Sequence, residues 1–262
     1  MKRLVIIIFA ILPFAVWAQD STAIAQPAYA EQVATKALAD SAYAQNNYAS
    51  AIELYETILA NSGEAPEIYY NLGNAYYKNN NIAKAILNYE RALLLNTSDE
   101  DTRFNLSLAQ SKIVDKVSER YQIFFMNWLY ALINTFNMTT WAVIGIVSFI
   151  VLLIALLIFF FNNSIALRKT GFTTAIIMLL VTIFANISAY YHYNKLTDRT
   201  DAIIISPSVT AKSTPNDSGT NLFVIHEGRK VKIIDDSMNS WKEIELEDGT
   251  QGWVPLSVLE RI

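Results

Sequence analysis

Residues 66–96 read PEIYYNLGNAYYKNNNIAKAILNYERALLLN, and a related segment precedes them at a constant shift. At this shift ASAIELYETIL (49–59) aligns with AKAILNYERAL (83–93). The aligned pairs include Ala51 with Ala85, Ile52 with Ile86, Tyr55 with Tyr89, and Asn46-Asn47 with Asn80-Asn81. A helix–turn–helix period of about 34 residues predicts a stack of helical hairpins that share one core, because a single hairpin cannot bury its apolar face.

One glycine stands inside this predicted helical pattern. Gly73 should cost about 1 kcal/mol relative to alanine in a helix interior, so a tertiary contact must favour a small residue there. Small side chains at Gly73 and Ala85 would let the two helices of one hairpin approach closely. We therefore expect a shared core of Leu72, Tyr76, Ile86 and Tyr89.

Residues 66–96 resemble the tetratricopeptide repeat over the whole repeat. The matching residues are Tyr69, Leu72, Gly73, Tyr76, Ala85, Tyr89 and Ala92. The preceding repeat (32–65) is more degenerate but keeps Leu38, Ala39, Ala51 and Tyr55, and Thr97 replaces the proline expected near the end of a repeat. A further helix of the first type is expected at about 100–113. The resemblance implies an all-α solenoid over 30–115, with two repeats and a trailing helix.

In this family the first helix of each repeat lines a groove. By resemblance, the groove-facing and partner-binding candidates are Lys36, Asp40, Tyr43, Tyr70, Asn71, Asn74 and Tyr77. Amide and phenol groups suit an extended peptide, and a solvated polar face is the alternative at each position. The family's pattern for gripping a C-terminal carboxylate is mostly absent, because Asp40, Asp101 and Asn105 depart from it. We do not expect a carboxylate clamp.

The first eighteen residues, MKRLVIIIFAILPFAVWA, combine a basic start with a short apolar run and a small residue at Ala18. This pattern predicts a cleaved signal peptide over 1–18. An uncleaved anchor is the alternative. Both place the next segment of the chain outside the cytoplasm.

Two longer apolar runs predict transmembrane helices at 139–161 and 172–193, joined as a hairpin by a cytoplasmic link over 162–171. With the signal peptide, this pattern predicts a bacterial inner-membrane protein with both flanking parts in the periplasm. Aromatic and aliphatic residues recur at helical spacing over 121–137, which predicts an amphipathic helix in the membrane interface. The alternative is a helix that caps the repeats.

After residue 200 short alternating runs predict a small β domain. The candidate strands are 202–206, 209–213, 221–226, 230–235, 241–247 and 251–256, with Asp248-Gly249 as a hairpin turn. Residues 200–262 resemble bacterial SH3-like domains, through A-K-S-x-P (211–215), H-E-G (226–228), Trp241 and D-G-x-x-G-W-V (248–254). The resemblance implies a small barrel.

SH3-like barrels also place aromatic residues on a ligand groove. The candidates for that groove are Phe223, Trp241 and Trp253. We expect Trp253 to belong mainly to the core and leave both roles open for Trp241.

Composition excludes several classes of protein. The chain has no cysteine, which excludes disulfides and thiolate metal sites, and its net charge of −4 gives no basis for nucleic-acid binding. His192 and His226 are isolated, and no triad or paired carboxylates occur. We therefore expect no enzymatic activity, no cofactor and no metal.

The order of signal peptide, repeats, interfacial helix, membrane hairpin and SH3-like module resembles the BatE branch of the Bat (aerotolerance operon) membrane proteins. That resemblance implies an envelope complex with von Willebrand A-type Bat proteins and a MoxR-type ATPase, linked to stress tolerance. The first hypothesis is a membrane-anchored periplasmic scaffold whose repeats hold partner proteins. The alternative is a cell-wall sensor whose SH3-like module binds peptidoglycan, and retention of that module on purified sacculi discriminates the two.

Overall fold

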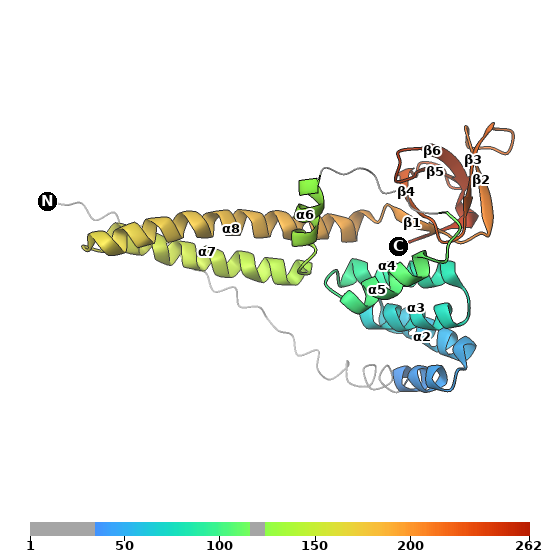
Figure 1. The fold of residues 1–262 in the computed structure, drawn as a ribbon, viewed down its shortest axis with the longest axis horizontal. Coiled ribbons are helices and arrows are strands. Elements are labelled where there is room, and N and C mark those ends of the chain that lie inside the picture. Colours follow the sequence, from blue (N-terminus) through green and yellow to red (C-terminus); the bar gives the residue numbers. More distant parts are fainter. Residues whose placement is uncertain (1–34, 116–123) are drawn as a thin grey trace.

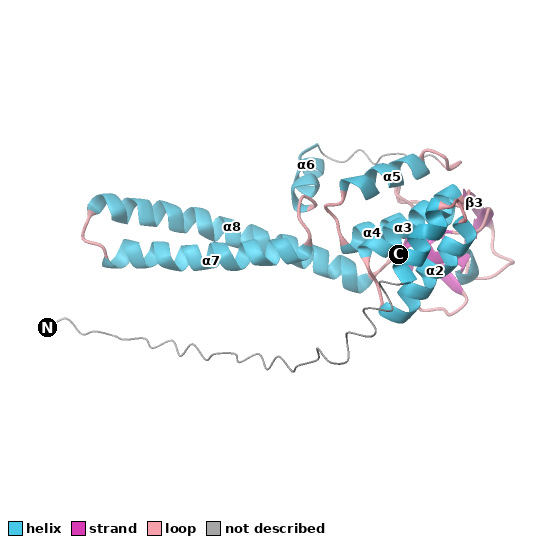
Figure 2. Ribbon diagram, turned by 90° about the horizontal axis from the view of Figure 1, so that it is seen from below, coloured by secondary structure: helices cyan, strands magenta, loops and turns pink. Residues whose placement is uncertain are grey.

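The structure, a computed structural model, describes residues 35–115 and 124–262. Within these ranges a helical repeat region, a two-helix hairpin and a β-sheet follow one another along the chain (Figure 1). The hairpin projects to one side, and the repeats and the sheet lie together at its other end (Figures 1 and 2). The predicted signal peptide and the first residues of the predicted interfacial helix lie outside the described residues.

The repeat region consists of antiparallel helices that pack in chain order. They are helical residues 35–44, α2 (Tyr48–Ser62), α3 (Pro66–Lys78), α4 (Ile82–Leu95) and α5 (Glu100–Gln110). The turns within the two hairpins are alike: Asn46 and Asn80 adopt left-handed conformations with φ of 61° and 62°. Asn47 and Asn81 then cap α2 and α4 by accepting a backbone N–H from the third residue beyond. The two repeats therefore share the same turn conformation and the same helix cap at positions one predicted period apart.

Gly73 lies where the two helices of the second repeat meet. A Cβ atom on Gly73 would stand 2.6 Å from Cε1 of the Tyr89 ring, which is closer than packed carbon atoms approach. Tyr89 is only 1% exposed and belongs to the same core as Leu72, Tyr76 and Ile86. The predicted need for a small residue is confirmed, and the ring of Tyr89 is the group that requires it.

The second part begins with α6 (Phe124–Ile133) and continues with the hairpin of α7 (Met138–Phe161) and α8 (Ile165–Asp198). Both hairpin helices are long and apolar enough to cross a membrane. The turn between them spans only 162–164, so most of the predicted link belongs to α8. Residues 165–171 contain no helix breaker except Gly171, and Gly171 is needed because a Cβ there would stand 2.9 Å from the Ala155 carbonyl.

The end of the predicted interfacial helix contacts both the α7–α8 hairpin and the repeats. Its Trp128 is 67% exposed, whereas the carbonyl of Ile133 accepts a hydrogen bond from Trp141 of α7 (2.8 Å) and lies 3.1 Å from the ring of His192 in α8. In the following turn the carbonyl of Asn134 accepts a hydrogen bond from Arg103 of α5 at 2.9 Å. The end of α6 therefore joins the hairpin to the repeats, and both sequence interpretations of this segment stay predictions.

The third part is an antiparallel sheet of seven strands in the order β3-β2-β6-β5-β4-β1-β7. The strands are β1 (Asp201–Ile204), β2 (Ser208–Lys212), β3 (Asn221–His226), β4 (Lys230–Asp235), β5 (Trp241–Glu245), β6 (Gln251–Pro255) and β7 (Leu259–Arg261), with a short 3-10 helix, η1 (Leu256–Val258). The six predicted strands are all present within two residues of their expected bounds. Strand β7 was not among the expected strands. The sheet is not closed, so a barrel is not confirmed.

Candidate partner-binding face of the repeats

The seven residues predicted to line a groove all lie on first helices, in 35–44 and α3, and all are partly exposed. We call this set the first-helix face: Lys36, Asp40, Tyr43, Tyr70, Asn71, Asn74 and Tyr77. Its positions follow from helical spacing, since the apolar positions between them are buried against α2 and α4.

The same hydrogen bond anchors this face in both repeats. The Tyr55 hydroxyl donates to Oδ1 of Asp40 at 2.5 Å, and the Tyr89 hydroxyl donates to Oδ1 of Asn74 at 2.7 Å. Each tyrosine projects from the core of the second helix to a polar residue on the first helix. The polar residues of the face are therefore held in fixed positions by buried rings, which reduces the entropy lost when a partner binds.

The Asn74 amide belongs to a larger network with α5. Nδ2 of Asn105 donates to Oδ1 of Asn74 at 3.0 Å and lies 3.2 Å from the Tyr70 hydroxyl. The rings of Tyr70 and Tyr89 lie 6.3 Å apart. In the sequence, Asn105 stands out only as a departure from a carboxylate clamp. Its position one repeat period after Asn71 was the available signal for placing it on the same face.

At the other end of the face, charged groups are paired within the chain. Nζ of Lys36 lies 2.9 Å from Asp40 and 3.1 Å from Glu67. The Asp40 carboxylate thus pairs with Lys36 and also accepts the hydrogen bond of Tyr55. This part of the face has little uncompensated charge to offer a partner.

Some residues of the repeats keep binding groups that are free for a partner. The Lys112 ammonium lies 4.0 Å above the Tyr77 ring, a cation–π contact. The Asn71 side chain forms no hydrogen bond within the described ranges, and Tyr43 stacks edge-on against Tyr48 at 5.4 Å. Asn71, Tyr77 and Lys112 therefore present an amide, an aromatic ring and a cation in the same repeat region, a set that suits a polar peptide with an acidic group.

Buried tyrosines make the repeats sensitive to alkaline pH. Burial, followed by hydrogen bonds to Asp40 and Glu56, raises the pKa of Tyr55 and Tyr76, and burial also raises the pKa of Tyr89. Because the folded state holds these protons more tightly, their stabilisation is complete below the unfolded pKa of about 10 and falls as pH rises above it, by at most about 1.4 kcal/mol per pH unit for each tyrosine.

We expect part of the phenolate absorbance to develop only as the helical signal is lost above this pH. A Tyr55→Phe, Tyr89→Phe variant should show a shallower loss of stability with pH than the wild type. Equal slopes for the two proteins would show that these rings do not control alkaline unfolding.

The three aromatic candidates of the C-terminal sheet occupy different faces of the sheet. Phe223 packs against the sheet core beside Gly252. Trp253 lies opposite Glu243 in the β5–β6 register, whereas Val254 and Ile244 point into the core and are fully buried. Because side chains alternate along a strand, Trp253 occupies the outer face, and the expectation of a core role is wrong. Trp241, opposite Pro255, shares that outer face.

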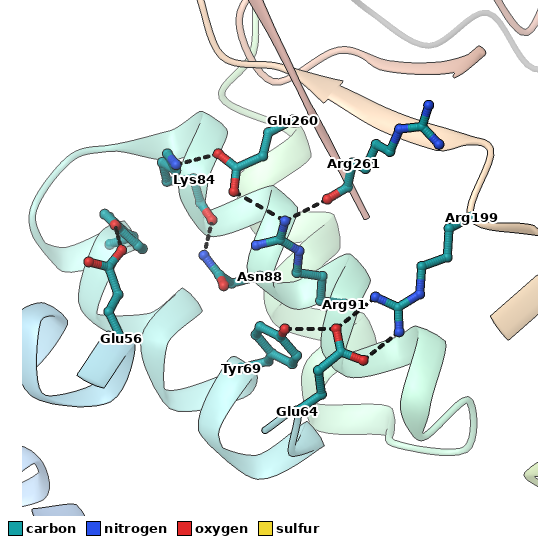
Figure 3. Close-up of polar contacts among 10 residues, drawn as sticks. Glu56, Glu64, Tyr69, Lys84, Asn88, Arg91, Arg199, Glu260 and Arg261 are labelled. Carbon is teal, nitrogen blue, oxygen red and sulfur yellow. Dashed lines mark hydrogen bonds and ion pairs between the residues drawn. The ribbon is translucent and has the colours of Figure 1, made fainter. Parts of the chain in front are cut away.

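The sheet docks onto the repeats through α4 (Figure 3). Glu260 of β7 lies 2.5 Å from Lys84 and 3.1 Å from Arg91, and Arg91 also donates to the Arg261 carbonyl at 2.6 Å. Ile203 and Ile262 of the C-terminal part belong to the hydrophobic core of the repeats. The second helix of this repeat is thus covered by the sheet, which leaves the first helices as the open side.

Two further contacts fix this arrangement. Arg199, just after α8, forms a bidentate ion pair with Glu64 in the turn before α3 (Figure 3). His226, which the sequence leaves isolated, is half-buried, with Nδ1 2.8 Å from Oδ1 of Asp115. The hairpin, the repeats and the sheet are therefore joined to one another by polar contacts.

Residues 36–102 match the tetratricopeptide repeat family. The match runs from helical residues 35–44 into α5 and so covers both hairpins described above. A search of curated proteins finds no match to the chain. Tetratricopeptide repeats indicate a protein–protein interaction scaffold, and the family is typically non-enzymatic. In the described ranges no group of three or more His, Asp or Glu side chains has an arrangement that could hold a metal.

Proposed function

We propose that this protein is a membrane-anchored scaffold that binds a partner protein on the first-helix face of its repeats. The single observation that carries the proposal is the pair of equivalent hydrogen bonds, Tyr55 to Asp40 and Tyr89 to Asn74, which fix polar groups on an open face. The hairpin of α7 and α8 would anchor this face at a membrane, since both helices are long and apolar enough to span one.

The finer assignment follows the resemblances noted in the sequence. A cleaved signal peptide would place the repeats and the SH3-like module in the periplasm, on the outer side of the inner membrane. The partners would be von Willebrand A-type Bat proteins and a MoxR-type ATPase system, in a Bat complex linked to aerotolerance or stress resistance. The common location of repeats and sheet at one end of the hairpin supports a single compartment for both (Figure 1).

Affinity purification of the full chain from solubilised membranes tests the proposal. We expect an Asn71→Ala, Tyr77→Ala variant to lose at least tenfold of its recovered partner, because loss of an interface anchor typically costs about 2 kcal/mol or more, with about 1.4 kcal/mol per factor of ten. These two residues are chosen because Asn74 and Asp40 also hold the fold together.

A matched variant changes an equal number of residues away from the face. Glu53→Ala, Thr57→Ala alters two exposed positions of α2 and should leave partner recovery unchanged. Equal partner recovery in the two double variants would show that the first-helix face is not the binding site.

Peptidoglycan binding through the C-terminal module is the second candidate. It is favoured by the positions of Trp241 and Trp253, which lie together on the outer face of the sheet. Partly exposed ring faces of this kind can stack on sugar rings. Retention of the full chain on sacculi that depends on Trp241 would support this candidate over the scaffold.

A further inference from the structure

A cavity of about 470 Å³ lies at the junction of the three parts of the molecule. Its walls come from α4, from the last turns of α8 and from β1 and β4, with Arg103 of α5 and Asn134 after α6 closing one side. Its volume falls within the range of roughly 300–1,000 Å³ typical of ligand sites. We call it the junction cavity.

The side chains that line the cavity carry more positive than negative charge. Among its acidic residues, Glu90 and Asp201 are both bound by Lys230, at 2.8 and 3.2 Å. The guanidinium of Arg103 meets only backbone carbonyls, those of Thr97 and Asn134, among the residues described.

Two lysines of the lining also contribute positive charge. Lys195 and Lys232 form no ion pair with any residue that the structure describes, although Lys232 lies between Asp201 of β1 and Glu245 of β5 in the strand register. Asp198 is the one acidic lining residue in the described ranges without an ion pair. Arg199 is neutralised by Glu64, so four lining cations remain against the three carboxylates of Glu90, Asp198 and Asp201. The lining keeps one net positive charge, and the cavity therefore favours an anionic ligand.

The position of the cavity along α8 indicates where that anion comes from. Tyr190, Tyr191 and Tyr193 end the apolar part of α8, and Tyr191 lines the cavity. Lys195 follows one helical turn later, at about 6 Å along the axis. Tyrosine concentrates at membrane interfaces, so a lysine at this height lies among lipid phosphates.

We propose that the junction cavity binds the phosphate group of an anionic lipid headgroup, with Lys195 and Lys232 as its cationic contacts. The lipid source rests on the membrane anchoring proposed above, whereas the phosphate chemistry rests on the cavity alone. Binding there would hold the repeats and the sheet against the membrane surface, because the lining residues come from both. The contacts of Lys230 and Arg199 stay unchanged in the bound state.

The test uses the purified full chain in detergent micelles and native mass spectrometry. Dioleoylphosphatidylglycerol is the anionic probe, dioleoylphosphatidylcholine the zwitterionic one and inorganic phosphate the soluble one. We expect phosphatidylglycerol to bind at least tenfold more tightly than phosphatidylcholine. A Lys195→Gln or Lys232→Gln substitution should weaken the tightest phosphatidylglycerol adduct at least tenfold.

Matched variants separate charge from folding. Lys78→Gln removes the same charge from an exposed end of α3 and should leave that adduct within twofold of the wild type. Lys195→Arg keeps the charge and should bind like the wild type. Loss of the adduct in Lys195→Arg as well as in Lys195→Gln would overturn the proposal, as would equal affinities for the two lipids.

The phosphate arm distinguishes the source of the ligand. Binding of inorganic phosphate that disappears in Lys195→Gln identifies a phosphate site that does not require lipid, and phosphatidylglycerol binding without it identifies a headgroup site. Both outcomes support the cavity as a phosphate site. Partner binding is tested through Asn71 and Tyr77, whereas phosphate binding is tested through Lys195 and Lys232. Failure of the scaffold proposal and failure of the cavity proposal therefore appear in different variants.

Discussion

A Gly73→Val substitution should lower the free energy of unfolding of the repeats by about 3 kcal/mol. The added Cβ would overlap the Tyr89 ring at 2.6 Å, and the ring cannot move freely because it is 1% exposed and its hydroxyl is bonded to Asn74. Gly73→Ala should cost less, since alanine regains about 1 kcal/mol of helix propensity. Hydrogen exchange of the α3 and α4 amides in the full chain measures the effect, and we expect exchange to accelerate roughly a hundredfold.

An exposed position supplies the control. Ala60→Val places the same branched side chain in α2, where Ala60 faces solvent, and should cost less than about 1 kcal/mol. If the amides of α3 and α4 exchange equally fast in Gly73→Val and Ala60→Val, the contact between Gly73 and Tyr89 does not limit the packing of the repeat.

A Lys230→Met substitution should weaken the docking of the sheet on the repeats by about 3 kcal/mol, because it leaves a carboxylate in the interface without its partner. Nζ of Lys230 contacts Glu90 of α4 and Asp201 of β1, and the Glu90 side chain is only 13% exposed. Burial alone would lower the pKa of Lys230, but the two carboxylates outweigh it and raise the pKa above its ordinary value. The pair therefore stabilises the charged lysine at neutral pH.

Hydrogen exchange at β1, β4 and α4 reports this docking. We expect roughly a hundredfold faster exchange at these amides in Lys230→Met, and no comparable change in Lys78→Met, which removes an exposed lysine from the end of α3. Adding Glu90→Gln to Lys230→Met should restore part of the loss, because the unpaired charge is removed. A double variant as unstable as the sum of the two single variants would show that the two groups are not coupled.

The local structure of the repeats was predictable because its signals are short in range. The repeat period, the paired asparagines and the glycine within a helical pattern all act within one or two turns of helix or across one hairpin. Strand positions were predictable for the same reason, since alternation and turn residues are local. The missed strand β7 has only three residues and lacks room for an alternating pattern.

The candidate site was predictable in part. Helical spacing is sufficient to place Asn71, Asn74 and Tyr77 on one helix, but not to show that Asn74 is bonded to Tyr89 and Asn105. The outer position of Trp253 also escaped prediction. A strand with two-residue alternation has two faces, and composition alone does not say which face the rest of the sheet covers.

By itself the sequence determined the repeat type, the two long apolar helices and the antiparallel pattern of the C-terminal part, because these depend on periodicity and turn chemistry. Only the tertiary structure decided how the parts meet. Lys84 and Glu260 are 176 positions apart and stand in different kinds of element, so no period relates them. Ile203 and Ile262 resemble ordinary strand residues, yet they complete the core of the repeats. The junction cavity exists because these distant contacts hold a sheet, a repeat and the end of a long helix at fixed positions.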